Sequence, residues 1–334
     1  MKEADIRPRA LFDGFLATVE EDAKRLFADH SGFVVIPCPA CASGEITESF
    51  TKIGFTYSRC ASCGSLYLSP RPPAEAFVRF YRDSKAVEYF ATHFYRQTEE
   101  ARRERLFRPR AALVADWAKR LGATESLADI GAGFGTFLEE VRATGAFGQV
   151  VAIEPAEKLS AVCREKGLTV LEMPVERAAD EASPAASFST CFEVFEHVHD
   201  PLGFVESMAG VLRPGGVMLF TTLTISGFDL LELWDQSKSI MPPNHINLLS
   251  TTGLERLIAR AGLDLVDLST PGQLDVDIVA NMLNEGPDLH VSRFAREIVA
   301  APEETRRRFQ QFLSDNRLSS HVRVIARKRG GAIS

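Results

Sequence analysis

A strand-like apolar run, residues 127–130, leads into three glycines at alternate positions and then into a segment of helical character, residues 137–144. A strand, a tight turn and a helix in this order let a ligand approach the backbone, because glycine has no side chain and accepts positive φ, and the helix N-terminus offers free N–H groups. A glycine-rich turn without a ligand is the alternative interpretation. The turn residues are Gly131, Gly133 and Gly135, with Phe134 between the last two.

Two acidic residues flank this turn in a way that selects the kind of ligand. Glu154 ends a second apolar run, where an α/β nucleotide site grips ribose hydroxyls. Asp129 stands just before the glycines, and a carboxylate there repels phosphate and favours a cationic ligand with an amino group and a sulfonium. The dinucleotide spacing G-x-G-x-x-G also fails, because Thr136 holds its third glycine position.

At this point the chain resembles the class I S-adenosylmethionine-dependent methyltransferases over roughly residues 108–270. The resemblance rests on the acid and glycines at residues 129–135, on Glu154, on Glu-Val-Phe-Glu-His-Val-His-Asp-Pro at residues 193–201, and on Leu-Arg-Pro-Gly-Gly at residues 212–216. It implies that S-adenosylmethionine is the cofactor. Asp129 and the glycines would hold its methionine part, Glu154 its ribose, and Val175 and Glu176 would lie near its adenine.

Methyl transfer from a sulfonium is an in-line displacement, so the protein has to align donor and acceptor and exclude water. An oxygen or carbon acceptor also loses a proton. His197 and His245 are the candidate bases, because imidazole titrates near neutral pH, and Glu193 and Glu196 are the alternatives. In the other interpretation, His197 only orders the cofactor end of its loop.

Four of the six cysteines form two C-x2-C pairs. Each pair places two thiolates on one tight turn, and the alternating residues between the pairs predict a hairpin that brings the turns together. Two facing turns give the tetrahedral sulfur site that Zn²⁺ prefers, and a fully occupied site of this kind is structural. Two disulfides are the alternative. The predicted metal ligands are Cys38, Cys41, Cys60 and Cys63.

Composition gives a broad class but no substrate. The chain has 334 residues, 45% of them hydrophobic and 25% charged, with a net charge of −7, so no global field attracts nucleic acid. No apolar run reaches the roughly 18 residues of a membrane span, and the charged start at Met1 is unlike a secretory signal. We therefore expect a cytoplasmic protein that does not bind a membrane.

The pattern predicts an α/β fold with a Rossmann-like sheet and helices on both of its faces. Strands are expected at residues 127–130, 150–154, 168–171, 189–194, 217–222, 263–268 and 322–326, and helices near 252–261 and 302–313. Four regions are expected: an N-terminal helix (1–30), a zinc-ribbon-like hairpin module (31–73), a helical lid or linker (74–121), and the methyltransferase domain with a C-terminal insertion (122–334).

The zinc hairpin ahead of such a domain narrows the resemblance to bacterial methyltransferases that act on sugars, including those of surface-polysaccharide pathways. It implies O- or C-methylation of a small polar acceptor, such as a sugar or a nucleotide-linked sugar. Two alternatives stay open. One is an RNA methyltransferase whose zinc module grips nucleic acid, against which the acidic balance stands. The other is a scaffold that binds the cofactor without catalysis.

Overall fold

The computed structural model describes residues 2–181 and 183–330, so residue 1 and residues 331–334, the outer ends of the first and last expected regions, lie outside it. A seven-stranded sheet with the order β10-β11-β8-β7-β4-β5-β6 forms its centre. The strands β8, β7, β4, β5 and β6 are parallel, and β11 runs antiparallel to both of its neighbours. The strands are β4 (Ser126–Ile130), β5 (Gln149–Ile153), β6 (Thr169–Leu171), β7 (Ala186–Phe192), β8 (Leu212–Leu223), β10 (Asp264–Ser269) and β11 (His321–Arg327).

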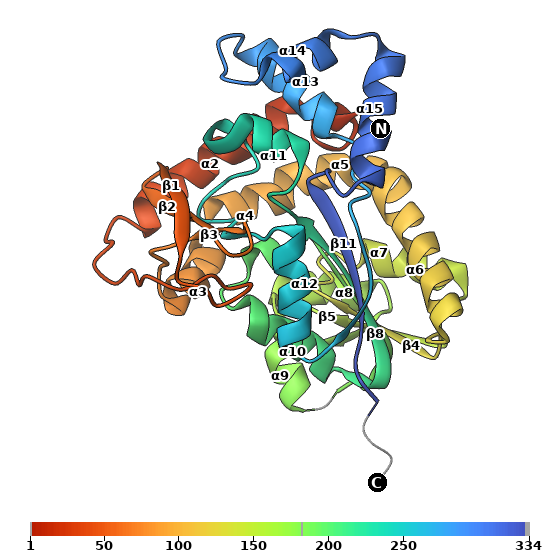
Figure 1. Cartoon of the computed structure of the whole chain (residues 1–334). Coiled ribbons are helices and arrows are strands. Elements are labelled where there is room, and N and C mark those ends of the chain that lie inside the picture. The colour runs from red at the N-terminus through yellow and green to blue at the C-terminus, as the bar shows by residue number, and fades with distance from the viewer. Residues whose placement is uncertain (1, 182, 331–334) are drawn as a thin grey trace.

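Helices cover both faces of this sheet, as the sequence predicts, because successive strand residues point to opposite faces. In β4, Ala128 packs into the core on one face and Leu127 into the core on the other. Figure 1 shows α10 and α12 on one side of the sheet and α6 and α7 on the other. The first face carries α9 (Val175–Asp180), α10 (Pro201–Gly210) and α12 (Thr251–Arg260); the second carries α6 (Arg108–Leu121), α7 (Thr136–Thr144) and α8 (Glu157–Glu165).

A second, antiparallel sheet has the order β1-β2-β3-β9. Its first three strands belong to the expected zinc module, but β9 comes from the expected methyltransferase domain. The two regions therefore share one sheet. Arg71, in the proline-rich segment between them, is 2% exposed and donates to the carbonyl of His199 and to Oδ1 of Asn247. The strands are β1 (Ile46–Lys52), β2 (Phe55–Cys60), β3 (Leu66–Leu68) and β9 (Asn247–Leu248).

The N-terminal helices pack over the carboxyl ends of the parallel strands. The segment expected as one helix over residues 1–30 is two, because Pro8 stands between them; Phe15 and Val19 of the second pack against Ala86 and Met241. Two π-helical turns interrupt the run that follows, a feature frequent at functional sites. The elements are α1 (Glu3–Ile6), α2 (Arg9–Leu26), α3 (Ala74–Asp83), α4 (Lys85–Tyr89), η1 (Phe90–Tyr95), α5 (Arg96–Arg102) and η2 (Arg103–Phe107).

The C-terminal insertion between β10 and β11 is helical. Its apolar residues, such as Val276 and Leu313, form a small core with Phe228. In Figure 1 these helices (blue) lie together at one end of the molecule. Among the described residues, no helix is both long and apolar enough to cross a membrane. The remaining elements are η3 (Phe195–His197), α11 (Phe228–Leu233), η4 (Trp234–Gln236), α13 (Asp275–Glu285), α14 (Arg293–Ala300) and α15 (Glu303–Asp315).

Candidate active site

The glycine turn lies between β4 and α7, at the carboxyl edge of the sheet. All three glycines have positive φ, between 57° and 70°. A Cβ atom on Gly131 would lie 2.7 Å from Cγ2 of Val194, so only glycine fits there. Around Gly133, by contrast, nothing lies within 4 Å of an ideal Cβ position. The turn therefore presents bare backbone to the space beside Gly133.

Glu154, one residue past β5, lies against this turn. Its Oε2 accepts a hydrogen bond of 2.8 Å from the N–H of Gly133, and its Oε1 accepts one of 2.9 Å from the N–H of Ala156. The side chain is 5% exposed, and this burial raises the pKa of the carboxyl group. Of the two residues expected near an adenine, Val175 is buried and Glu176 is exposed at the start of α9.

Asp129 is the last acid before the glycines and is also buried. Its Oδ1 accepts a hydrogen bond of 2.7 Å from the hydroxyl of Thr190 on β7. Burial raises the pKa of Asp129 to about 7, and the negative charge of Glu154 acts in the same direction. A cationic ligand would relieve both effects, because an opposite charge favours the ionised carboxylate. The pair Asp129 and Glu154 therefore fits the positively charged donor that the sequence indicates.

An aromatic residue of the helical region closes over the turn. The ring of Tyr95, in η1, stacks on Phe134 with centroids 4.0 Å apart, and its hydroxyl donates to Oγ1 of Thr136 at 2.7 Å. The helical segment that was predicted as a lid or linker thus contacts the glycine turn and the start of α7. The sequence did not single out Tyr95 among its neighbours, since several aromatic residues crowd the same stretch.

Glu193 lies one residue past the end of β7. Its φ is +55°, a strained value for a residue other than glycine. Oε1 is 2.9 Å from the guanidinium of Arg110, 2.9 Å from Nε2 of His321 and 2.7 Å from the hydroxyl of Thr221. Although burial opposes it, the charges of His321 and Arg110 hold the pKa of Glu193 well below its usual range. Glu193 is thus an anion fixed by partners, which makes it a poor proton acceptor.

The other three proton-transfer candidates meet one turn further along. Nδ1 of His197 donates to the carbonyl of Asn244 at 2.8 Å, and Nδ1 of His245 donates to that of Ser239 at 2.7 Å. Each imidazole thereby keeps the lone pair of Nε2 free. The two ring centroids are 5.0 Å apart.

A carboxylate oxygen of Glu196 completes this group, and the three ligand-capable atoms lie within 4.8 Å of one another, close enough to share one cation. Glu196 accepts from the hydroxyl of Thr222 at 2.7 Å, and burial raises its pKa. Burial, and then the charge of His197, lower the pKa of His245 to about 3. His245 is therefore neutral across the physiological range.

Two cavities open on this side. One, of about 270 Å³, is lined by Glu196, His197 and His245 together with aromatic residues of the helical region. The other, of about 360 Å³, is lined by arginines and by the segment that begins the C-terminal insertion. Both cavities include Glu193 and Arg102 in their walls. His321 was not predicted as a site residue. Arg102 and Arg110 belong to the arginine-rich stretch of the predicted helical lid, which was considered as a possible contact for a polar or phosphorylated substrate without either residue being singled out.

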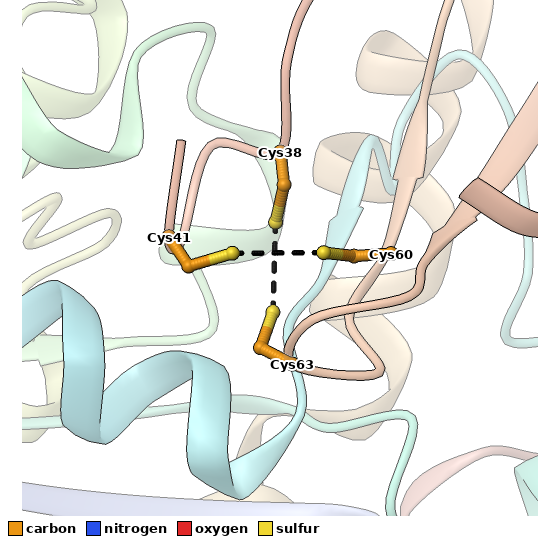
Figure 2. Close-up of side chains that lie close together, drawn as sticks. All are labelled: Cys38, Cys41, Cys60 and Cys63. Carbon is orange, nitrogen blue, oxygen red and sulfur yellow. Dashed lines mark hydrogen bonds between the residues drawn. The ribbon is translucent and has the colours of Figure 1, made fainter. Parts of the chain in front are cut away.

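The four predicted metal ligands come together as predicted. Figure 2 shows their sulfur atoms pointing toward a common centre. Sγ of Cys38 lies 3.6 Å from Sγ of Cys63, and Sγ of Cys41 lies 3.5 Å from Sγ of Cys60. These separations are far longer than a disulfide of about 2.05 Å. They are close to the sulfur–sulfur distance of about 3.8 Å that a tetrahedral Zn²⁺ with Zn–S bonds of about 2.3 Å requires. The donor set and its geometry therefore fit zinc.

This fold, with its cofactor turn at the carboxyl edge of a parallel sheet, is that of a class I S-adenosylmethionine-dependent methyltransferase. A family model described as a methyltransferase domain matches residues 99–268. Since the match covers half of the chain, the chain belongs to this family of methyltransferase domains.

Curated relatives share part of this region. A ubiquinone biosynthesis O-methyltransferase of Bordetella bronchiseptica is 38% identical over 101 residues, which are 28% of this chain and 41% of that protein. The enzyme of the same name from Xanthomonas axonopodis pv. citri is 32% identical over 154 residues, 42% of this chain and 63% of that protein. The chain thus spans about half the length of these relatives.

Solved structures are similar to this chain only at low sequence identity. The plantazolicin methyltransferase, crystallised in complex with SAH, has a TM-score of 0.49 and 8% sequence identity, over 75% of this chain and 93% of that one.

Proposed function

We propose that the chain transfers a methyl group from S-adenosylmethionine to an oxygen atom of a small polar acceptor. The observation that carries the proposal is that the glycine turn packs against Val194. The next residue along the chain on one side, Glu193, lines a cavity together with His197 and His245. Oxygen is favoured over carbon as the acceptor atom because the relatives named above are O-methyltransferases.

The residues that would hold the cofactor lie at the carboxyl ends of β4 and β5 and in the turn between β4 and α7. Bound S-adenosylmethionine supplies a methyl group on a positively charged sulfonium. The bare backbone beside Gly133 would take its methionine part, with Asp129 balancing positive charge from beneath. Glu154 would accept hydrogen bonds from the ribose hydroxyls. The N–H groups of Gly133 and Ala156, which donate to this carboxylate, hold it in place.

We assign the general base to His197, and an orienting role to His245. A base works best when its pKa is near the working pH, and His245, with a pKa of about 3, binds a proton too weakly. The lone pair on Nε2 of His197 is free, because Nδ1 is committed to the carbonyl of Asn244. The ring centroid of His245 lies 5.0 Å from that of His197, so His245 can accept a hydrogen bond from a second, neighbouring hydroxyl of the acceptor while His197 takes the proton of the reacting one.

The acceptor itself stays a prediction. A sugar or a nucleotide-linked sugar, expected from the zinc hairpin, is not supported by the relatives, whose names refer to ubiquinone biosynthesis. What the cavity supports is a small molecule, since its volume of about 270 Å³ approaches the lower end of ordinary ligand pockets.

We also propose that the four cysteines hold a structural Zn²⁺. Four thiolates leave no open coordination position, so the ion would take no part in methyl transfer. Its place in the fold supports a structural role: Ser250, the N-cap of α12, donates to the carbonyl of Cys63.

Two measurements test the proposed function. SAH binding is followed by titration calorimetry, and methyl transfer is followed with labelled cofactor over a panel of catechols, sugars, nucleotide sugars and RNA. Glu154→Gln is expected to weaken SAH binding about tenfold or more. His197→Gln should leave SAH binding within about twofold and lower turnover by about 10²–10⁴. His290→Gln, an exposed histidine, is the matched control.

Each failure has a distinct meaning. A chain that does not bind SAH would contradict the whole proposal. SAH binding without turnover over the panel would favour a cofactor-binding scaffold, and turnover on RNA alone would favour the RNA methyltransferase. Full turnover by His197→Gln would remove the assigned base but leave the activity.

A further inference from the structure

The larger cavity, of about 360 Å³, has an excess of positive charge in its wall. Its lining also includes apolar side chains, such as Leu106, Leu113 and Ile278, so that a ligand with both a charged and an apolar part would fit. Two carboxylates face it, those of Glu193 and Asp275. The positive residues are Arg7, Arg102, Arg105, Arg110 and Arg323, with His321 beside them.

Three of the five guanidinium groups have carboxylate partners. Arg105 pairs with Asp5 at 2.6 Å and Arg110 with Glu193 at 2.9 Å. Arg323 lies 3.6 Å from Asp267 and donates to Ser269.

For Arg7 and Arg102, the described residues provide no carboxylate within 4 Å. Asp275, the remaining acid of the wall, is 1% exposed and accepts from Ser319, Ser320 and Gln310. Two cations of the cavity are therefore left without an internal counterion.

Of these two arginines, Arg102 gives the stronger indication that the cavity binds an anion. Its Nε atom is buried without a hydrogen-bond partner, and the guanidinium lies 5.9 Å from the ring centre of Phe107. Burial, and repulsion by Arg110 and Arg7, lower the pKa of Arg102 to about 10. A half-buried cation whose Nε donor is buried and unpaired is costly to keep, and an oxyanion in the cavity would satisfy both its charge and its fork of N–H groups.

We propose that this cavity binds an oxyanion on the methyl acceptor, a phosphate or a carboxylate, through Arg102 and Arg7. The proposal rests on the proposed function and names the acceptor as an acid. Neither the glycine turn nor Glu154 lines the cavity, which lies beyond Phe192 and Glu193 on the acceptor side. Arg102 and Glu193 also line the cavity with His197 and His245, so an acceptor anchored at Arg102 would extend its hydroxyl toward the imidazoles.

The test compares phenyl phosphate, benzoate and neutral phenol as ligands of the full chain, titrated at constant ionic strength with and without saturating SAH. At least one of the two anions is expected to bind about tenfold or more tightly than phenol, since charge-assisted hydrogen bonds to arginine are made only by an anion. Tighter phenyl phosphate would identify a phosphorylated acceptor, and tighter benzoate a carboxylic acid.

Arg102→Met should abolish this preference, and Arg7→Met, on a different segment, should reduce it. Arg96→Met, an exposed arginine at the start of α5, should leave it unchanged. The two cavity variants together keep the test valid if one of them is poorly folded by circular dichroism.

Three results would overturn the proposal: equal affinity for the anions and phenol, an anion preference that survives both cavity variants, or loss of anion binding when SAH is present. The last would mean that the arginines hold the carboxylate of the cofactor. Failure of SAH binding beside intact, Arg102-dependent anion binding would instead contradict the proposed function.

Discussion

Asp129→Asn should make the stability of the ligand-free protein less dependent on pH. The folded chain holds this carboxyl group buried, with a pKa raised from 3.8 to about 7. Between these two values the group is protonated in the folded chain and ionised in the unfolded chain. Folding therefore takes up a proton, and the stability of the wild type falls as the pH rises through this window. Asparagine keeps the shape and carries no proton to lose.

The size of the effect follows from the pKa values. The span from 3.8 to about 7, at about 1.4 kcal/mol for each pH unit, corresponds to about 4 kcal/mol once the pH exceeds the folded value. At about pH 5 only about 1.6 kcal/mol of this penalty is present. The free energy of unfolding of the variant minus that of the wild type should therefore increase by about 3 kcal/mol between about pH 5 and about pH 8.

Urea unfolding at the two pH values, followed by tryptophan fluorescence and circular dichroism, measures this gain. Titrating groups that do not interact with Asp129 are common to both proteins and cancel in the comparison. A gain below about 1 kcal/mol would refute the argument that Asp129 is buried without a compensating charge. The same variant should bind SAH and S-adenosylmethionine more weakly, because the carboxylate that faces the cationic ligand is gone.

Two other predictions concern the metal site and the turn. Purified protein should contain about one zinc per chain by elemental analysis. The variant Cys60→Ser should lose the zinc and unfold at a lower urea concentration, whereas the control Cys163→Ser, which changes a buried cysteine outside the cluster, should keep it. Retention of zinc by Cys60→Ser would refute the site. Gly131→Ala should cost about 1–3 kcal/mol of unfolding free energy, because its Cβ would meet Val194 and its φ is +70°. Wild-type stability in this variant would mean that the turn relaxes freely.

The sequence predicts the central sheet well because its strands are local apolar runs. Each expected strand of the large sheet is present with ends shifted by a few residues; β8 starts earlier, at Leu212, since the turn before it continues into the strand. The glycine turn and the two cysteine pairs are equally local signals, with their spacing written in the chain.

The acceptor side could not be predicted in the same way. Glu193 meets Arg110 and His321, which are 83 and 128 residues away along the chain, and no short pattern joins them. The preference for His197 over His245 likewise depends on the lowered pKa of His245, which arises from its surroundings in the fold and which spacing does not reveal. Arg71 stands among prolines that indicate a stiff extended segment and give no sign of burial, yet it is one of the most buried side chains.

Because β3 pairs with β9, the strands of the cysteine module and the segment that follows His245 belong to the same antiparallel sheet. Tyr57 of β2 donates to the carbonyl of His245 at 2.6 Å, and the N–H of Leu68 donates to the carbonyl of Ile246 at 2.9 Å. Removal of the metal would therefore act on the loop that carries His245, because these hydrogen bonds tie that loop to the strands of the cysteine module. Removal of the zinc should then lower the rate of methyl transfer more than it weakens the binding of S-adenosylmethionine.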